Sequence, residues 1–226
     1  MPDSGSRTSL QVPFGLRDSR LFEPLQVDSG LRCNCVCPGC LAPLIARHSP
    51  SGKVSPNFAH ASDTACTGGL ESALHLAAKQ LIADRRALYL PELGAPLSGP
   101  SKWWSVIQRS AVIREGFLSE LQDVRLEEKV GSIRPDLLVK TFDQEIMVEI
   151  ANTHFVTPEK LEHIRRQGVA TIEVDVSDLV ILNFEALAKR LFEATPRAKW
   201  VFHPELAARE LELQPLLAVA MAEDHF

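Results

Sequence analysis

Two acidic residues interrupt a pair of apolar segments in the stretch IRPDLLVKTFDQEIMVEIANTH, residues 133–154. Asp136 precedes the apolar run 137–139, and Glu149 lies within the run 146–150. A lone buried carboxylate is costly, and two converging carboxylates repel each other unless a cation lies between them. Mg²⁺ and Mn²⁺ prefer such oxygen ligands and can activate water against a phosphodiester. The pair therefore predicts a Mg²⁺ or Mn²⁺ site that acts on a phosphate.

A catalytic site of this kind usually needs a third group that orients water or neutralises developing charge. Lys160 is the candidate, because it falls in the first turn of the helix expected after Glu149 and can point back toward the strand end. The alternative is that Lys160 is a solvated helix lysine. For the two acids, the alternative is that Asp136 and Glu149 each accept a salt bridge or cap a turn, with Arg134 or Lys140 as partners.

All five cysteines lie between Cys33 and Cys66, which favours a metal site over a dispersed disulfide framework. Cys37-Pro-Gly-Cys40 forms a CxxC knuckle, and His60 with Cys66 completes a second pair. Four Cys or His ligands are what a structural zinc requires. The sequence predicts a Zn²⁺ site made of Cys37, Cys40, His60 and Cys66.

Two nearby cysteines and one histidine leave alternatives open. On a strand, Cys33 and Cys35 would point to the same side as Cys37, so either could replace one of the four ligands. They could equally be small buried apolar side chains. His48 is the weaker histidine, because it lies in a polar loop.

Three polar residues lie on one face of a helix expected in LESALHLAAKQLIADRRALYL, which Pro91 should end. Glu71, His75 and Lys79 are spaced at i, i+4 and i+8. They form either a solvated face or the lining of a cleft, in which Glu71 would touch a metal-bound water.

The elements that must position these residues can be read from the pattern. Two strands should form a hairpin that turns near Asp143 and Gln144, and VATIEVDVS should form a third strand beside them. Between them a helix should start with Thr157 as N-cap and Pro158 at its first position, and Gly168 should lie just past its end. A strand, a helix and a strand in this order make a crossover, so the flanking strands should be parallel neighbours.

The remaining segments yield coarser predictions. LSELQDVRLEEKV is expected to form one strand, FEALAKRLFEA a helix and WVFHP a short strand, with a mostly helical tail. GLRDSRLFEPLQVDSGL should contain a strand or two, and the piece around Trp103 should be helical or irregular.

Composition bounds the class of protein. The 226 residues are 45% apolar, enough for one full core, and no window approaches the roughly 18 apolar residues that span a bilayer. We expect a soluble, cytoplasmic protein that does not enter membranes, and the sequence leaves its oligomeric state open.

The net charge of −5 requires that any contact with nucleic acid be local or helped by bound cations. Trp103 and Trp104 are more simply core or interface residues than a base-stacking platform.

Several motifs occur in an order that resembles a known group. They are CPGC, NFAH with Cys66, ESALHLAAKQLI, RPDLL, and VEIANTH followed by EKLEHIRRQG and IEVDVS. Together they resemble the competence protein CoiA-like group of the PD-(D/E)xK nuclease superfamily over about residues 30–180.

The resemblance implies an α/β, restriction-endonuclease-like fold: a mixed central sheet flanked by helices, with a small zinc-ribbon-like module at the N-terminus. It implies that Asp136 and Glu149 bind the catalytic metal ion, that Glu71 lies on the first core helix, and that DNA is the substrate in competence and recombination. The sequence departs from the pattern at Ala151, where the motif has Lys, and at Asn57, where similar proteins often have His.

We therefore expect a zinc-binding module at residues 1–68 and a nuclease-like domain at residues 69–226. The predicted activity is that of a metal-dependent deoxyribonuclease, with Glu71, His75, Asp136, Glu149 and Lys160 as catalytic residues. Two other classes compete with it. One is a zinc-containing nucleic-acid-binding protein whose catalytic site has decayed, and the other is a scaffolding protein.

Overall fold

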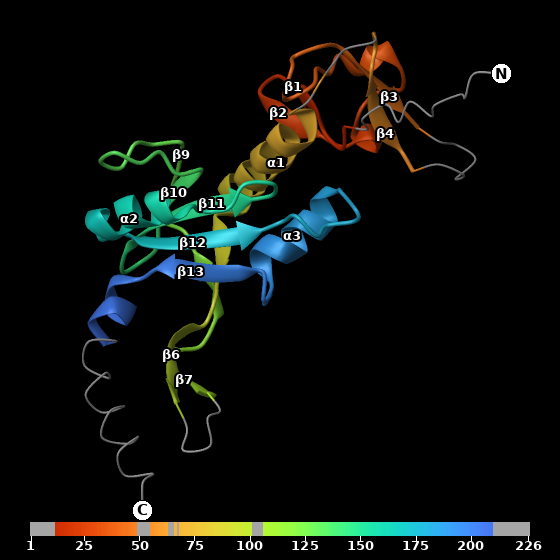
Figure 1. Ribbon diagram of the computed structural model, residues 1–226. Coiled ribbons are helices and arrows are strands. Elements are labelled where there is room, and N and C mark those ends of the chain that lie inside the picture. Colours follow the sequence, from red (N-terminus) through yellow and green to blue (C-terminus); the bar gives the residue numbers. More distant parts are fainter. Residues whose placement is uncertain (1–11, 49–54, 63–65, 67, 101–105, 210–226) are drawn as a thin grey trace, which may run out of the picture. The chain divides into compact units, whose positions relative to one another are not determined.

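The computed structural model describes residues 12–48, 55–62, 66, 68–100 and 106–209, and for residues 95–100 and 106–111 it describes the backbone alone. The chain divides into two compact units (Figure 1). The first comprises Met1–Arg85 and Val176–Lys189, and the second comprises Arg86–Asp175 and Arg190–Phe226. The expected boundary at residue 68 between a zinc module and a nuclease-like domain stays a prediction.

The first unit is built from short strands, turns and one long helix. The predicted strands near its start form a hairpin whose turn residues, Asp18 and Ser19, both have positive φ, as tight hairpin turns require. Its elements are β1 (Gly15–Arg17), β2 (Arg20–Phe22), the 3₁₀ helices η1 (Pro24–Gln26) and η2 (Leu31–Cys33), the antiparallel pair β3 (Leu44–Arg47) and β4 (Asn57–His60), and helix α1 (Gly69–Arg85).

Helix α1 ends earlier than the sequence pattern suggested. The prediction carried it to Pro91, but Arg86 has a φ of 49° and the chain continues as strand β5 (Ala87–Leu90). This strand pairs antiparallel with β8 (Phe117–Glu120) and buries Leu88 and Leu90. Strand pairing and burial thus override a locally helical pattern.

The second unit contains a five-stranded mixed sheet in the order β13-β12-β11-β10-β9 (Figure 1). The predicted hairpin and crossover are both confirmed, because β10 pairs antiparallel with β11 and β11 pairs parallel with β12 across helix α2. The elements are β9 (Asp123–Leu126), β10 (Leu137–Lys140), β11 (Glu145–Ala151), α2 (Pro158–Gln167), β12 (Ala170–Asp175) and β13 (Ala198–Phe202). The mixed α/β class is therefore as expected, while the restriction-endonuclease-like fold stays a prediction.

Other sequence predictions for this unit are partly wrong. The single strand expected between residues 118 and 130 is two strands, β8 and β9. Residues 93–114, expected as a link and a helical or irregular piece, contain the antiparallel pair β6 (Leu93–Pro100) and β7 (Val106–Arg114). Trp103 and Trp104 lie outside the described residues. The helix predicted near residue 187 is present as α3 (Phe184–Phe192), most of which belongs to the first unit.

Both faces of the central strands are buried, which explains their nearly continuous apolar runs. On one face, Leu138 and Met147 pack with Ile133 and with Ile164 of α2. On the other face, Ile146 and Val148 of β11 are fully buried. A polar side chain on either face therefore enters a largely apolar surrounding.

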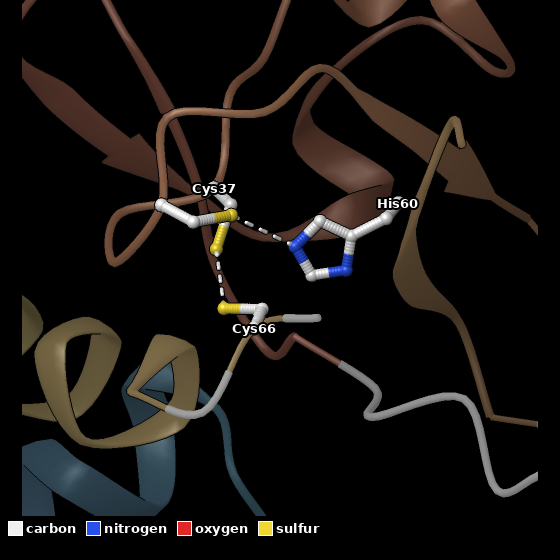
Figure 2. A group of neighbouring side chains, drawn as sticks. Cys37, His60 and Cys66 are labelled. Atoms are coloured by element: carbon white, nitrogen blue, oxygen red, sulfur yellow. Dashed lines mark hydrogen bonds between the residues drawn. The ribbon is translucent and has the colours of Figure 1, made fainter. Parts of the chain in front are cut away.

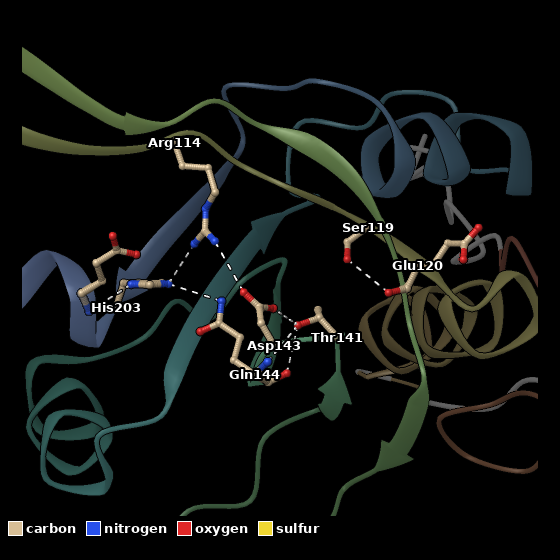
Figure 3. Close-up of polar contacts among 8 residues, drawn as sticks. Arg114, Ser119, Glu120, Thr141, Asp143, Gln144 and His203 are labelled. Carbon is tan, nitrogen blue, oxygen red and sulfur yellow. Dashed lines mark hydrogen bonds and ion pairs between the residues drawn. The ribbon is translucent and has the colours of Figure 1, made fainter.

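Polar contacts hold the β10–β11 turn against the end of β13 (Figure 3). Thr141 donates a hydrogen bond to Asp143 at 2.7 Å, and Asp143 lies 3.7 Å from Arg114. Gln144 and Arg114 both approach Nε2 of the buried His203, at 3.5 and 3.4 Å. These contacts fix the hairpin at the end opposite to Glu149.

None of the described helices has the length and apolarity needed to cross a membrane.

Candidate functional site

Four predicted zinc ligands come together in the first unit. The possible ligand atoms of Cys37, Cys40, His60 and Cys66 all lie within 4.8 Å of one another. Sγ of Cys37 is 3.7 Å from Sγ of Cys66, and Sγ of Cys40 is 3.3 Å from Nε2 of His60. Figure 2 shows the side chains of Cys37, His60 and Cys66 converging. A Cys₃His set at this spacing could bind a structural zinc.

Backbone geometry brings these ligands together. The CxxC knuckle closes on itself, since the Leu41 N–H donates to the Cys37 carbonyl at 2.9 Å. His60 is the last residue of β4, and Cys66 lies just before α1. Gly69, the first residue of α1, lies against the sulfurs, and a Cβ there would be 2.8 Å from Sγ of Cys66. A helix N-terminus beside thiolates favours their negative charge.

The cysteines of this group differ in how readily they ionise. Burial raises the pKa of the Cys37 thiol to about 11. The exposed Cys40 has a lowered pKa, chiefly because the backbone N–H of Ala42 donates to its sulfur. Zinc binds the thiolate, so loading the site would release the proton of Cys37.

The other candidate ligands lie outside this group. Cys33 and Cys35 are buried, and their thiols donate to the carbonyls of Leu44 and Cys33, each at 3.3 Å. His48 lies 2.6 Å from the Pro24 carbonyl through Nε2. The two cysteines are therefore small buried side chains, which is the second of the two alternatives for them.

The acidic pair of the second unit lies on one face of the sheet. Met147 and Glu149 are two residues apart on β11 and so point to the same face of the sheet. Because Met147 packs against Ile164 of α2, Glu149 projects toward the face that α2 covers. Asp136 precedes β10 and its Oδ2 accepts a hydrogen bond from the Ile150 N–H at 2.9 Å. This contact holds the carboxylate of Asp136 beside the strand position next to Glu149.

Glu149 is an acid in an unfavourable surrounding. Its exposed fraction is 8%, and burial raises the pKa of its carboxyl above the ordinary value. The negative charges of Asp136 and Glu173 add to this rise, while Lys160 opposes it. Each of these charges is thus near enough to act on Glu149.

Lys160 reaches Glu149 from helix α2. Its Nζ lies 2.7 Å from Oε1 of Glu149, in an ion pair whose lysine side chain is 35% exposed. The start of α2 is fixed as predicted, with Pro158 in the first turn and Thr157 as N-cap. The Thr157 side chain accepts the Lys160 N–H at 3.2 Å. Lys160 is therefore not a free helix lysine.

The sequence prediction missed Glu173. This residue lies on β12 directly opposite Glu149 in the parallel register and is 2% exposed. Its carboxylate accepts the Val156 N–H at 2.6 Å and lies 2.8 Å from Nζ of Lys199. A signal was present in the sequence, because a strand expected beside Glu149 carries an acid within its apolar run.

The carboxylates do not form a compact ligand group in the structure. Among the described residues, only the Cys₃His set brings the ligand atoms of three or more Cys, His, Asp or Glu residues within 4.8 Å of one another. Asp136, Glu149 and Glu173 do not meet that criterion together. A catalytic Mg²⁺ or Mn²⁺ therefore stays a prediction.

The stripe of Glu71, His75 and Lys79 belongs to α1 in the first unit. Glu71 and His75 are half-buried and Lys79 is buried, which is not the pattern of a fully solvated face. Asp136 and Glu149 belong to the second unit. That Glu71 and His75 act together with these acids stays a prediction.

Comparisons with known proteins return no relative that could decide between these possibilities. No protein-family model matches the chain, and no curated protein or solved structure matches it.

Proposed function

We propose that this chain is a divalent-metal-dependent deoxyribonuclease of the PD-(D/E)xK superfamily, similar to CoiA-like proteins, that hydrolyses DNA during processing or recombination. One observation carries the proposal. The Asp136 carboxylate accepts the N–H of Ile150, the residue that follows the buried Glu149. The ammonium of Lys160 lies 2.7 Å from the Glu149 carboxylate. Two acids and a lysine in this relation supply the chemical groups that the superfamily motif requires.

The residues present fit a hard divalent cation. Asp136 and Glu149 offer oxygen ligands, and the raised pKa of Glu149 indicates a buried charge that one lysine does not fully compensate. These two carboxylates would hold Mg²⁺ or Mn²⁺, which when bound would lower the pKa of a water and neutralise charge on the phosphate.

Lys160 would replace the lysine that the motif places two residues after its glutamate. That position is Ala151, whose side chain is 2% exposed and carries no donor. The Lys160 ammonium approaches the same carboxylate from α2 in an ion pair, and a hydrogen bond from it could orient a water or a phosphate oxygen. The departure at Ala151 is thus compatible with activity.

The zinc site would have a structural role within the first unit. Four protein ligands fill the coordination of a tetrahedral zinc and leave no position for substrate. Zinc would therefore stabilise β3, β4 and the start of α1 rather than take part in hydrolysis.

The proposal is tested by incubating the purified protein with single- and double-stranded DNA and Mg²⁺ or Mn²⁺. The wild type should cleave DNA and stop when EDTA is added. Asp136→Ala and Glu149→Ala should abolish cleavage without a large fall in melting temperature. Glu145→Ala is the matched control and should cleave like the wild type, because Glu145 is an exposed acid on the same strand.

Two outcomes would contradict the nuclease. The first is cleavage by the Asp136 and Glu149 variants at the wild-type rate. The second is binding of DNA that survives EDTA, with no hydrolysis in any divalent ion, which would favour the non-catalytic nucleic-acid-binding protein instead. Its affinity should then fall steeply with salt, because phosphate contacts release counterions.

A further inference from the structure

A second buried carboxylate, Glu173, lies directly beside Glu149. The two residues occupy paired positions on parallel strands β12 and β11, with exposed fractions of 2% and 8%. Like charges on neighbouring strand positions are destabilising. A buried acid in this place therefore needs an explanation that packing alone does not provide.

Both oxygens of Glu173 have partners. Oε1 lies 2.8 Å from Nζ of Lys199, and Oε2 accepts the Val156 N–H at 2.6 Å. Burial differs sharply between the two partners of the ion pair, since the Lys199 side chain is 66% exposed. The short hydrogen bond to a backbone N–H is the more specific contact, because a charged acceptor strengthens it.

Val156 is the point where the chain enters α2. It follows the irregular segment 152–155 and precedes Thr157, the N-cap whose side chain accepts the Lys160 N–H. From the first turn of that helix, Lys160 reaches Oε1 of Glu149 at 2.7 Å. A continuous series of contacts thus runs from Glu173 through Val156 and Thr157 to Lys160.

We infer that Glu173 is a positioning residue, which fixes the entry to α2 through the Val156 N–H and so places the Lys160 ammonium at Glu149. Glu173 does not bind the metal ion, since both its oxygens are engaged and the three carboxylates do not form a compact ligand group. The inference rests on the proposed nuclease function for its effect on rate, but not for its structural content.

Substitutions at Glu173 separate positioning from ligation. Glu173→Gln keeps a carbonyl oxygen that can accept the Val156 N–H, whereas Glu173→Ala keeps none. Glu173→Ala should slow cleavage about 100-fold, because a misplacement near 1 Å can cost that much. Glu173→Gln should recover most of the rate. Affinity for Mn²⁺, measured by titration calorimetry, should stay within about twofold of the wild type in both variants, a difference of about 0.4 kcal/mol.

Coupling to Lys160 distinguishes positioning from a general structural role. Adding Glu173→Ala to Lys160→Met should cause no further loss of rate, because Glu173 acts only through the position of Lys160. Lys199→Ala is the matched control and should cleave within about twofold of the wild type, because it removes the ion pair at Oε1 and leaves the Val156 N–H bonded to Oε2 of Glu173.

Amide hydrogen exchange tests the same contact without any activity. Exchange at Val156 and Lys160 should accelerate at least about tenfold in Glu173→Ala, or in Glu173→Met if the alanine variant does not fold, relative to Lys199→Ala and to Glu173→Gln, which keeps an acceptor for the Val156 N–H. Unchanged exchange, additive loss with Lys160→Met, or a tenfold fall in Mn²⁺ affinity would each overturn the inference. If the wild type does not cleave DNA, the proposed function fails while the exchange result still decides the role of Glu173.

Discussion

The carboxylate of Glu149 lies where its ionisation costs free energy. Burial is the largest cause, and the charges of Asp136 and Glu173 add to it. In the unfolded chain the carboxyl gives up its proton near the ordinary pKa of 4.5, whereas the folded protein holds the proton to higher pH. Between these two values the folded state binds more protons, so the free energy of unfolding falls as the pH rises.

Replacing Glu149 by glutamine should therefore stabilise the protein at neutral pH. The amide carries no charge, and Lys160 can still contact water because its side chain is 35% exposed. We expect Glu149→Gln to have a higher free energy of unfolding than the wild type at about pH 8, with the difference shrinking toward about pH 5. Urea denaturation at both pH values measures it.

The matched control for this experiment is Glu145→Gln. Glu145 is an exposed acid on the same strand that forms an ion pair with Arg125, so its loss should cost about 0–1 kcal/mol. If Glu149→Gln is instead less stable than the wild type at high pH, the ion pair with Lys160 outweighs burial, and Glu149 is a structural residue.

At the residue scale, residue type and spacing predicted the candidate metal ligands, but the sequence did not reveal which side chains contact one another in the fold. CxxC spacing and the second Cys and His pair identified the four members of the metal group. His48 was already the weaker candidate from its polar loop, whereas the choice against Cys33 and Cys35 followed from hydrogen bonds that the sequence cannot show. Glu173 was missed because its relation to Glu149 depends on the register of two strands separated by a helix.

At the element scale, the start of α1 packs against the candidate zinc ligands. Gly69 is buried, and a Cβ there would lie 2.8 Å from Sγ of Cys66 and 3.1 Å from Sγ of Cys37. A Cβ on Gly39 would in turn lie 2.7 Å from Cα of Gly69. The absence of side chains at these two positions lets the helix approach the knuckle.

Gly69→Ala should therefore disturb zinc binding. The added methyl group must displace a sulfur or the helix, which should weaken zinc affinity at least tenfold, about 1.4 kcal/mol, and destabilise the fold by about 1–3 kcal/mol. A competition titration with a chromophoric chelator and thermal unfolding measure the two effects. Gly68→Ala is the control, because nothing lies within 4 Å of a Cβ there, and it should stay within about 0.5 kcal/mol of the wild type. Equal affinities in the two variants would contradict the close approach.

Local signals predicted elements well where the chain carries its own start and stop residues. Thr157, Pro158 and Gly168 bound α2 as expected, and Gly168 adopts the left-handed conformation with a φ of 68°. The predicted end of α1 and the prediction of a single strand in place of β8 and β9 were wrong, because both features depend on pairing between β5 and β8. Such pairing is non-local, so residues 86–90 read alone favour the helix.

At the scale of the whole molecule, the two candidate metal sites belong to different compact units. Cys37, Cys40, His60 and Cys66 lie in the first unit, and Asp136 with Glu149 lies in the second. Trp200 lies on β13 in the second unit, whereas Trp103 and Trp104 lie outside the described residues. Emission of Trp200, measured with Trp103 and Trp104 replaced by phenylalanine, thus reports on the unit that carries the acids and not on the unit that carries the cysteines.

Zinc and magnesium should stabilise different units. Structural zinc in small modules contributes about 10–16 kcal/mol, so chelating it should remove most of the native far-ultraviolet signal of the first unit while the midpoint of tryptophan emission changes little. Mg²⁺ at about 100 times its dissociation constant should raise the tryptophan midpoint, since binding then adds about 2.7 kcal/mol. Asp136→Ala is the control for that rise and should abolish it. Zinc added back should restore the first unit, and Mg²⁺ should not. A single transition that shifts equally with both ions would mean that neither site acts within its own unit, because binding energy at one would then reach both.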